Sequence, residues 1–210
     1  MNFNIFTTLL KSVESLPLGG LEILLEMAPE IRKKVAEDSI AGKNPRKAAV
    51  LALFYPNEQQ ETCFSLMERA AYNGTHSAQI SFPGGKEEPT DKNLAHTALR
   101  ETQEEIGIPS KNIILIKEMT TTYIPPSNFL VSPFIGICKT TPVFTANNEV
   151  KELLEIKLAD LLNETNKTTA ILSTSYQKNM ETPCFLLNGH IVWGATAMML
   201  NEIKHMLNKV

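Results

Sequence analysis

The sequence predicts an α+β fold in which helices cover a mixed β-sheet, and an α/β/α sandwich satisfies that pattern. Segments with helical spacing are interspersed with strand-like segments, several of which follow one another in tandem. The chain has 210 residues, 43% of them hydrophobic and 20% charged, which suits one domain with a sizeable core. No internal repeat or low-complexity tract interrupts it. We expect a single domain (1–210), with a helical extension at 1–45 and the core at 46–210.

The N-terminal half is expected to contain helices, then strands, then a long acidic helix. We predict helices at 2–14 and 20–37, the second broken at Pro29, strands at 48–55, 62–69 and 79–82, and a helix at 94–106. The range 48–55 is continuously apolar, which indicates a buried strand. Gly107 follows the acidic helix, where a left-handed residue commonly ends one.

The C-terminal half is expected to alternate short strands and helices. We predict strands at 113–119, 129–138 and 153–156, a stiff loop at 123–128, a helix at 158–162, a polar loop at 163–169, a hairpin of 183–187 and 190–193, and a helix at 194–207. Asn188-Gly189 is a strong turn signal for the hairpin.

Charge and composition narrow the class of protein. The net charge is −3 and the isoelectric point about 5.9, so the chain lacks the basic surface that nucleic acid or an anionic membrane would attract. The N-terminus has no basic region typical of a signal peptide, and no apolar run approaches the roughly 18 residues of a membrane span. We therefore expect a cytoplasmic protein that binds neither nucleic acid nor membrane. Cys63, Cys138 and Cys184 lie in apolar surroundings and are expected to be reduced thiols.

The acidic helix carries an electrostatically costly cluster. Glu101, Glu104 and Glu105 have the spacing i, i+3, i+4 and so share one helical face. They lie in the last turns, where the helix dipole disfavours each negative charge by roughly 0.3–1 kcal/mol. Arg100 can pair with Glu104, but one guanidinium does not neutralise three carboxylates. The bland alternative is a solvated charged face; a divalent cation, Mg²⁺ or Mn²⁺, would offset the cost.

The range 82–108 resembles the Nudix box, the signature of the Nudix hydrolases. In that box a glycine, five residues, an acid and a spacer precede Arg-Glu-x-x-Glu-Glu-x-Gly and an aliphatic residue. The matching residues are Gly85, Asp91, Arg100, Glu101, Glu104, Glu105, Gly107 and Ile108. The chain departs by having Asp91 in place of Glu, eight spacer residues in place of seven, and Thr102 where an aliphatic residue is usual. A spacer longer by one residue resembles that of the coenzyme A pyrophosphatase branch of the Nudix hydrolases.

Flanking segments extend this resemblance over about residues 16–200. The range 66–85 is similar to a phrase that marks the coenzyme A branch, and it fits at Arg69, His76, Gln79, Phe82, Pro83, Gly84 and Gly85. It departs at Met67, Ala70, Gly74 and Ala78, which replace Thr, Ser, Arg and Gly of the branch. The segments 125–134, 191–197 and 16–32 also resemble phrases of the branch.

The resemblance implies a Nudix-type α/β/α sandwich around a mixed sheet and a set of functional residues. Metal would be held by the carbonyl of Gly84 and by Glu101, Glu104 and Glu105. Arg100 would orient a carboxylate, with a plain helix ion pair as the alternative. Substrate would be contacted by Arg69, His76 and Gln79; otherwise Arg69 is a surface cation and His76 a packing residue.

A further acid from a later loop is expected as metal ligand or general base. Glu149 or Glu152 is the candidate, and either could instead be a solvated glutamate.

The resemblance also implies a reaction. The first hypothesis is metal-dependent hydrolysis of coenzyme A or acyl-CoA, giving adenosine 3′,5′-bisphosphate and 4′-phosphopantetheine. The second is hydrolysis of another nucleoside diphosphate derivative, such as ADP-ribose or a dinucleotide, because Gly74 and Ala78 depart from the branch. The third is a non-catalytic Nudix-fold nucleotide-binding module, which has no physical need for the carboxylate cluster. The partner is thus a small-molecule nucleotide, and family dimers make a homodimer plausible.

Overall fold

The computed structural model describes residues 1–35, 43–70, 79–173 and 179–210. The helices are α1 (Phe3–Ser15), α2 (Gly20–Leu25), α3 (Glu30–Val35), α4 (Leu94–Ile106), α5 (Leu158–Leu162) and α6 (Gly194–Leu207), with short 3₁₀ turns η1 (Ser110–Asn112), η2 (Pro125–Ser127) and η3 (Glu164–Asn166). The strands are β1 (Arg46–Pro56), β2 (Thr62–Arg69), β3 (Ile80–Ser81), β4 (Gly84–Lys86), β5 (Ile114–Glu118), β6 (Thr122–Ile124), β7 (Phe129–Ile137), β8 (Val150–Lys157), β9 (Lys167–Leu172), β10 (Met180–Leu187) and β11 (His190–Trp193).

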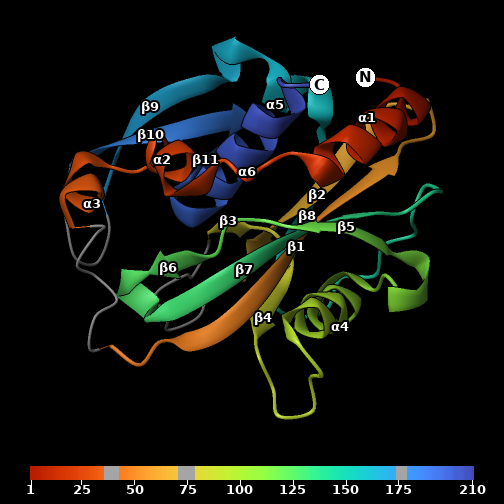
Figure 1. The fold of residues 1–210 in the computed structure, drawn as a ribbon, viewed down its shortest axis with the longest axis horizontal. Coiled ribbons are helices and arrows are strands. Elements are labelled where there is room, and N and C mark those ends of the chain that lie inside the picture. The colour runs from red at the N-terminus through yellow and green to blue at the C-terminus, as the bar shows by residue number, and fades with distance from the viewer. Residues whose placement is uncertain (36–42, 71–78, 174–178) are drawn as a thin grey trace.

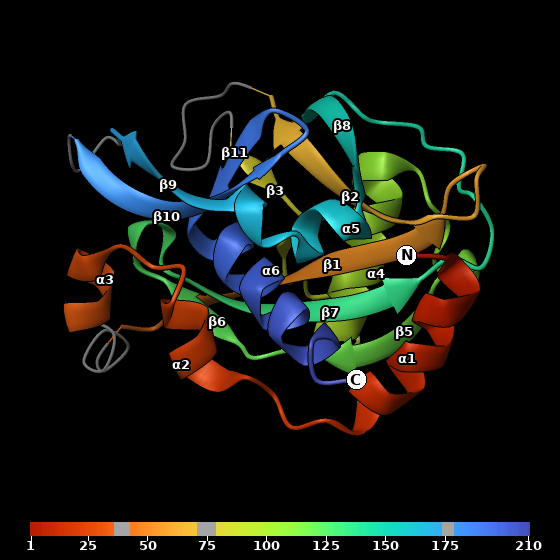
Figure 2. The ribbon, with the colours of Figure 1, turned by 90° about the horizontal axis from the view of Figure 1, so that it is seen from above.

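A mixed sheet with the order β3-β2-β1-β7-β5 forms the centre of the molecule, and β4, β6 and β8 pair with β1, β7 and β2. A smaller antiparallel sheet has the order β11-β10-β9. Helix α4 covers one face of the central sheet, and α1, α2 and α6 lie on the other side (Figures 1 and 2). The predicted α+β class and the layered arrangement around a mixed sheet are confirmed, and the smaller sheet is an addition to it.

Strand β1 organises the central sheet. It runs parallel to β7 from the pair Arg46–Phe129 to the pair Phe54–Ile137. Its other edge is shared, because Ala48–Val50 pair with β4 and Phe54–Pro56 pair with β2. The short strand β4, which contains the Gly-Gly pair, is therefore held against the middle of the sheet, directly beside the face that α4 covers.

Side chains of β1 are buried on both faces, as its continuous apolar sequence predicts. Ala48, Ala52 and Phe54 belong to the hydrophobic cluster beneath α1 and α6. Residues of the other parity belong to the cluster beneath α4; they are Ala49, Leu51, Leu53 and Tyr55. One strand thus links the two halves of the core.

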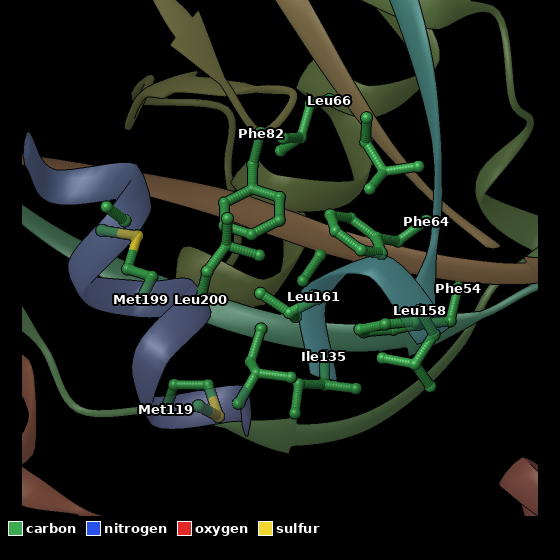
Figure 3. Packing of buried hydrophobic residues seen from close by; sticks show 14 of the residues in the cluster. Phe54, Phe64, Leu66, Phe82, Met119, Ile135, Leu158, Leu161, Met199 and Leu200 are labelled. Atoms are coloured by element: carbon green, nitrogen blue, oxygen red, sulfur yellow. The ribbon is translucent and has the colours of Figure 1, made fainter. Parts of the chain in front are cut away.

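The larger cluster joins strands to helices across the central sheet. Figure 3 shows aromatic side chains of the sheet packed against α5 and α6. The labelled residues include Phe54, Phe64, Leu66, Phe82, Leu158, Leu161, Met199 and Leu200. Phe82 immediately precedes the Pro-Gly-Gly segment and is 1% exposed, so its burial anchors the start of β4.

Local signals fix both ends of α4. The side chain of Asn93 accepts a hydrogen bond from the backbone N–H of His96, which caps the N-terminus. Gly107 takes a left-handed conformation with φ of 77° and donates its N–H to the carbonyl of Gln103. The predicted bounds of this helix, 94–106, are confirmed.

Three strands, β4, β6 and β9, escaped the sequence prediction. The predicted stiff loop at 123–128 is wrong at its start, because β6 extends to Ile124 and pairs there with β7. The predicted polar loop at 163–169 is wrong from Lys167 onward, because β9 begins there. Most side chains of β9 are exposed or half-buried, so its sequence gives no apolar signal, and pairing with β10 makes it a strand. β4 was hidden by its two glycines, and β8 begins at Val150, before the predicted 153–156.

The second predicted helix, 20–37, forms as α2 and α3 on either side of the Pro29 break, and its last two residues lie outside the described ranges.

The three cysteines are free and buried, as predicted. Burial raises the pKa of the Cys63 thiol to about 12 and that of Cys138 to about 11, which keeps both as neutral thiols. Among the described helices, none combines the length and the apolar character needed to cross a lipid bilayer.

Replacing Leu200 with alanine is expected to lower the free energy of unfolding by about 2–5 kcal/mol, because the side chain is fully buried between α6 and the sheet. Leu186 is the matched control, since it is 46% exposed on β10 and its replacement by alanine is expected to cost about 0.5 kcal/mol. Urea unfolding of both variants checks this. Equal losses would contradict the assigned core.

Candidate active site

The three glutamates of α4 have different surroundings although they share a helical face. The side chain of Glu105 is 2% exposed, that of Glu101 16%, and that of Glu104 55%. The helix is rotated so that Glu105 points under β4 while Glu104 stays at the surface. Only Glu105 therefore bears the full cost of removing a carboxylate from water.

Glu105 is held by partners from two strands. The backbone N–H of Gly84 donates to Glu105 Oε2 at 2.7 Å, and Arg69 Nη2 lies 3.1 Å from Glu105 Oε1. Burial raises the pKa of Glu105 to about 7, and the Arg69 charge and the Gly84 N–H only partly oppose that rise. The partners that Glu105 has in the structure therefore compensate its burial only in part.

Glu101 lies directly over the second glycine of β4. A Cβ atom placed on Gly85 would come within 2.5 Å of Glu101 Cδ, so a side chain there would displace the carboxylate. Burial raises the pKa of Glu101 above its ordinary value, and Arg100 opposes that rise. Glycine at this position therefore leaves the Glu101 carboxylate undisturbed.

Arg100 forms a charged network that joins α4 to Asp91 and to the end of β4. Its Nη1 lies 3.0 Å from Glu101 Oε1 and 3.1 Å from Glu104 Oε2, which confirms the expected pairing with Glu104. Its Nε and Nη2 each donate to one oxygen of Asp91 at 3.0 Å, and Nη2 also donates to the carbonyl of Lys86. A two-point bond of this kind fixes the plane of the guanidinium.

Asp91 is the anchor of that network. Its side chain has no exposed surface and also accepts hydrogen bonds from Thr97 Oγ1 and the backbone N–H of Glu88. The two bonds from Arg100 hold the pKa of Asp91 well below its ordinary value. The altered spacing of the box is thus compatible with a carboxylate that orients Arg100, which in turn orients two glutamates.

The loop before β8 is tied to the end of α4. Thr145 N–H donates to the carbonyl of Ile106, and Asn147 N–H donates to the carbonyl of Glu105. Asn147 Oδ1 in turn accepts the N–H of Glu149 at 2.8 Å. This places Glu149 where its charge also contributes to the raised pKa of Glu105, after burial and the charge of Glu101.

Glu149 and Glu152, the two candidates for the further metal ligand or general base, therefore differ in their surroundings. Glu152 lies on β8 opposite Glu68, and its charge acts on Lys151.

Of the three proposed substrate contacts, Arg69 and Gln79 lie in segments that the structure describes. Arg69, at the end of β2, donates from Nη2 to the carbonyl of Gly84 at 2.7 Å, which brings it to the glutamates. The carbonyl of Gln79 accepts the N–H of Arg69. His76, Gly74 and Ala78 lie in 71–78, outside the described residues.

The donor set fits a divalent cation by its charge and chemistry. Two guanidinium groups, Arg69 and Arg100, face four carboxylates, those of Asp91, Glu101, Glu104 and Glu105. Two negative charges are uncompensated among these groups when all are ionised. In the described part of the chain, no three His, Cys, Asp or Glu side chains stand close enough together to hold an ion as they are. The ligand assignment therefore stays a prediction.

Comparison with known families assigns the chain. A model of the NUDIX domain matches residues 45–171, more than half of the sequence. This chain belongs to the Nudix family. The resemblance of its glutamate-bearing helix to the Nudix box is thereby confirmed, and the Nudix box can be located in the structure as β4, the turn around Asp91, and α4.

Named relatives agree with the coenzyme A branch of the Nudix family. The human mitochondrial coenzyme A diphosphatase NUDT8 is 31% identical over 157 residues, 74% of this chain and 66% of that protein. Mouse NUDT8 is 33% identical over 128 residues, 60% of this chain and 61% of that protein. An uncharacterised Nudix hydrolase, NudL, of Pectobacterium atrosepticum is 31% identical over 143 residues, 66% of this chain and 71% of that protein. This chain thus matches 61–71% of these relatives' own lengths.

Solved Nudix structures share the fold. The M. smegmatis Nudix hydrolase RenU has a TM-score of 0.52 at 14% identity, covering 79% of this chain and 88% of that one. A MutT/nudix family protein from Enterococcus faecalis has a TM-score of 0.54 at 15% identity, covering 85% and 68%. At these identities the likeness establishes the Nudix fold alone.

One departure from the Nudix box has a simple structural explanation. Thr102 is fully buried, and its hydroxyl donates to the carbonyl of Ala98 one helical turn earlier at 2.7 Å. The hydroxyl is therefore satisfied within the helix. Its methyl group occupies the buried face where the family usually has an aliphatic residue.

Sequence reasoning missed the role of Asp91 and of the loop 145–149. The spacing of the Nudix box names Asp91, but only the fold shows that it binds Arg100 through two oxygens. The loop carries no charged motif at its contact points with α4, since backbone N–H groups make those bonds.

Replacing Asp91 with asparagine is expected to weaken Mn²⁺ binding and turnover by about 10- to 100-fold, because Arg100 loses its charged anchor and releases the glutamates that it orients. Calorimetric titration with Mn²⁺ and steady-state kinetics measure both effects. His96→Ala is the control, since His96 contacts the same carboxylate from the surface and is 46% exposed. An unchanged Asp91→Asn variant would show that Arg100 needs no anchor.

Proposed function

We propose that this Nudix protein is a Mg²⁺- or Mn²⁺-dependent hydrolase of the diphosphate bond in coenzyme A or an acyl-CoA, releasing adenosine 3′,5′-bisphosphate and 4′-phosphopantetheine. The observation that carries the reaction class is the Nudix helix folded against β4, with Glu105 buried on Gly84 and Glu101 over Gly85. A helix built only for stability has no use for that arrangement, which also argues against a non-catalytic module.

The chemical difficulty of this reaction is electrostatic, since water must attack a phosphorus surrounded by anionic oxygens. Glu101, Glu104, Glu105 and the carbonyl of Gly84 would hold the cation, which when bound would neutralise phosphate oxygens and activate water. Arg100 orients Glu101 and Glu104, and it is itself held by the carbonyl of Lys86 at the end of β4. Glu149 is the better placed of the two candidate late acids, because its charge acts on Glu105, and it would serve as ligand or general base.

The choice of coenzyme A rests on sequence likeness to relatives and to the branch phrases. Human and mouse NUDT8 are named coenzyme A diphosphatases. The branch phrase over 66–85 supplies Arg69, which reaches the glutamates in the fold. The replacement of an expected arginine by Gly74 and of a glycine by Ala78 favours a second candidate, a Nudix hydrolase of another nucleoside diphosphate derivative.

Cellular location and assembly belong to the same proposal. A small nucleotide is the proposed partner, a homodimer is plausible for the family, and the cytoplasm stays the prediction from sequence. The human relative is named as a mitochondrial protein, so its name does not support the cytoplasmic prediction.

Coenzyme A is expected to be cleaved only with Mg²⁺ or Mn²⁺ present, and mass spectrometry of the separated products should identify 4′-phosphopantetheine. Glu104→Gln is expected to reduce kcat by at least about 100-fold with an unchanged melting temperature, since the side chain is 55% exposed and contributes little to the fold.

Glu118→Gln is the control for this assay, because Glu118 is an exposed glutamate at the end of β5. Equal turnover by Glu104→Gln and the wild type would refute the metal assignment. Hydrolysis of ADP-ribose or a dinucleotide in preference to coenzyme A, at equal concentrations, would establish the second candidate.

The late acid is identified by comparing Glu149→Gln with Glu152→Gln. Glu149→Gln is expected to lower kcat by about 100-fold or more, because Glu149 is electrostatically coupled to Glu105. Glu152→Gln is expected to act like the wild type, because Glu152 lies on β8 beside Lys151. The reverse ranking in steady-state assays would move the role to Glu152.

A further inference from the structure

One nitrogen of Arg69 lies between two of the proposed metal ligands. Nη2 is 2.7 Å from the carbonyl oxygen of Gly84 and 3.1 Å from Glu105 Oε1. These oxygens come from β4 and α4, and a positively charged atom bridges them. The guanidinium thus occupies the electrostatic role that the Nudix site otherwise assigns to a divalent cation.

The backbone of β2 is built to deliver this side chain. The register between β2 and β8 shifts between Glu68 and Arg69, as at a β-bulge, and bulges redirect side chains. Glu68 instead pairs with Lys151 at 2.7 Å. On either side of Arg69 Cα the chain is fixed, since Arg69 N–H donates to Gln79 and the next N–H, that of Ala70, donates to Glu149.

The side chain itself is less constrained than its backbone. It is 20% exposed, whereas its partner Glu105 is 2% exposed. An arginine has several rotatable bonds, so the guanidinium can leave these two oxygens while its Cα stays fixed. A divalent cation bound to the same oxygens would repel a guanidinium a few ångströms away, which favours that departure.

We propose that Arg69 is an internal counter-cation of the metal-free site, which a divalent cation displaces, and that the freed guanidinium then contacts the diphosphate of the substrate. The first half rests on the proposed metal ligands, and the second half on the proposed hydrolysis. Metal and Arg69 compete for Gly84 and Glu105, whereas metal and substrate cooperate through Arg69. The protein thereby keeps a buried carboxylate paired when no metal is bound.

Binding of Mn²⁺ to the substrate-free protein tests the competition, with the free ion followed by electron paramagnetic resonance. Arg69→Met is expected to bind Mn²⁺ about fivefold to tenfold more tightly than the wild type, because no side-chain cation must be displaced. Mn²⁺ should also raise the melting temperature of Arg69→Met by more than it raises that of the wild type.

Arg46→Met is the matched control, because it removes the same charge from the chain. Arg46 is an exposed arginine that donates to the carbonyl of Ser127 and stacks on Phe129 with its guanidinium carbon 4.1 Å from the ring centre. Its Mn²⁺ affinity is expected to stay within about twofold of the wild type, since salt screens distant charges.

The outcomes separate this inference from the proposed function. No Mn²⁺ binding by the wild type would overturn the metal site, and this inference with it. If the wild type binds Mn²⁺ and Arg69→Met binds it with an equal or larger dissociation constant, only the counter-cation role is overturned. If Arg46→Met gains as much Mn²⁺ affinity as Arg69→Met, the effect comes from net charge alone, and the counter-cation role is again overturned.

Nuclear magnetic resonance of the wild type keeps the test decisive if Arg69→Met fails to fold. The Nε–Hε signal of Arg69, assigned from its loss in Arg69→Lys, is expected to shift on titration with Mg²⁺ in parallel with the backbone amide of Gly84. A shift of the Gly84 signal with an unmoved Arg69 signal would show that the guanidinium stays in place and would overturn the proposal.

Discussion

The burial of one carboxylate, that of Glu105, constrains the whole site. A carboxylate removed from water must be compensated by hydrogen bonds or charge, and here the compensation comes from Gly84 N–H on β4 and Arg69 on β2. These contacts with Glu105 bring together α4, β4 and β2, which are separate in sequence. Burial still raises the pKa of Glu105 to about 7 even with an arginine beside it, since the partners present do not fully replace water.

The glycines of β4 serve this constraint through their lack of side chains. Gly84 has φ of 152°, and a Cβ atom there would collide with the backbone of β1, whereas one on Gly85 would collide with Glu101. Glycine at Gly84 therefore lets β4 pair closely with β1, and Gly85 leaves room for the Glu101 carboxylate. Charge also fixes α4, because Asp91 holds Arg100 and Arg100 holds Glu101 and Glu104. The close approach of β4 and this ion network together fix the orientation of the helix.

Backbone hydrogen bonds then attach distant segments to this helix. The loop before β8 is bonded to the last carbonyls of α4, and Ala70 N–H is bonded to the carbonyl of Glu149. At one end of the loop, Asn147 is bonded to the backbone of Glu105. At the other end, Glu149 is bonded to Ala70, the neighbour of Arg69, and Arg69 contacts the Glu105 side chain. The proposed late acid and the proposed counter-cation are coupled to the same carboxylate through these bonds, so changes at one are expected to be felt at the other.

Local sequence patterns are sufficient to predict the bounds of α4. The glutamate spacing and Gly107 are local signals, and the helix bounds 94–106 predicted from the sequence are confirmed. The apolar strands β1, β2 and β7 and the hairpin at Asn188-Gly189 were also readable, because periodicity and turn chemistry act over a few residues. The strands β4, β6 and β9 were not, since their pairing partners define them. Packing in three dimensions is what buries Glu105 and leaves Glu104 exposed. It also brings Asp91 to Arg100, and Arg69 to Gly84 and Glu105. Burial and long-range ion pairs depend on how separate segments pack, which local sequence patterns do not encode.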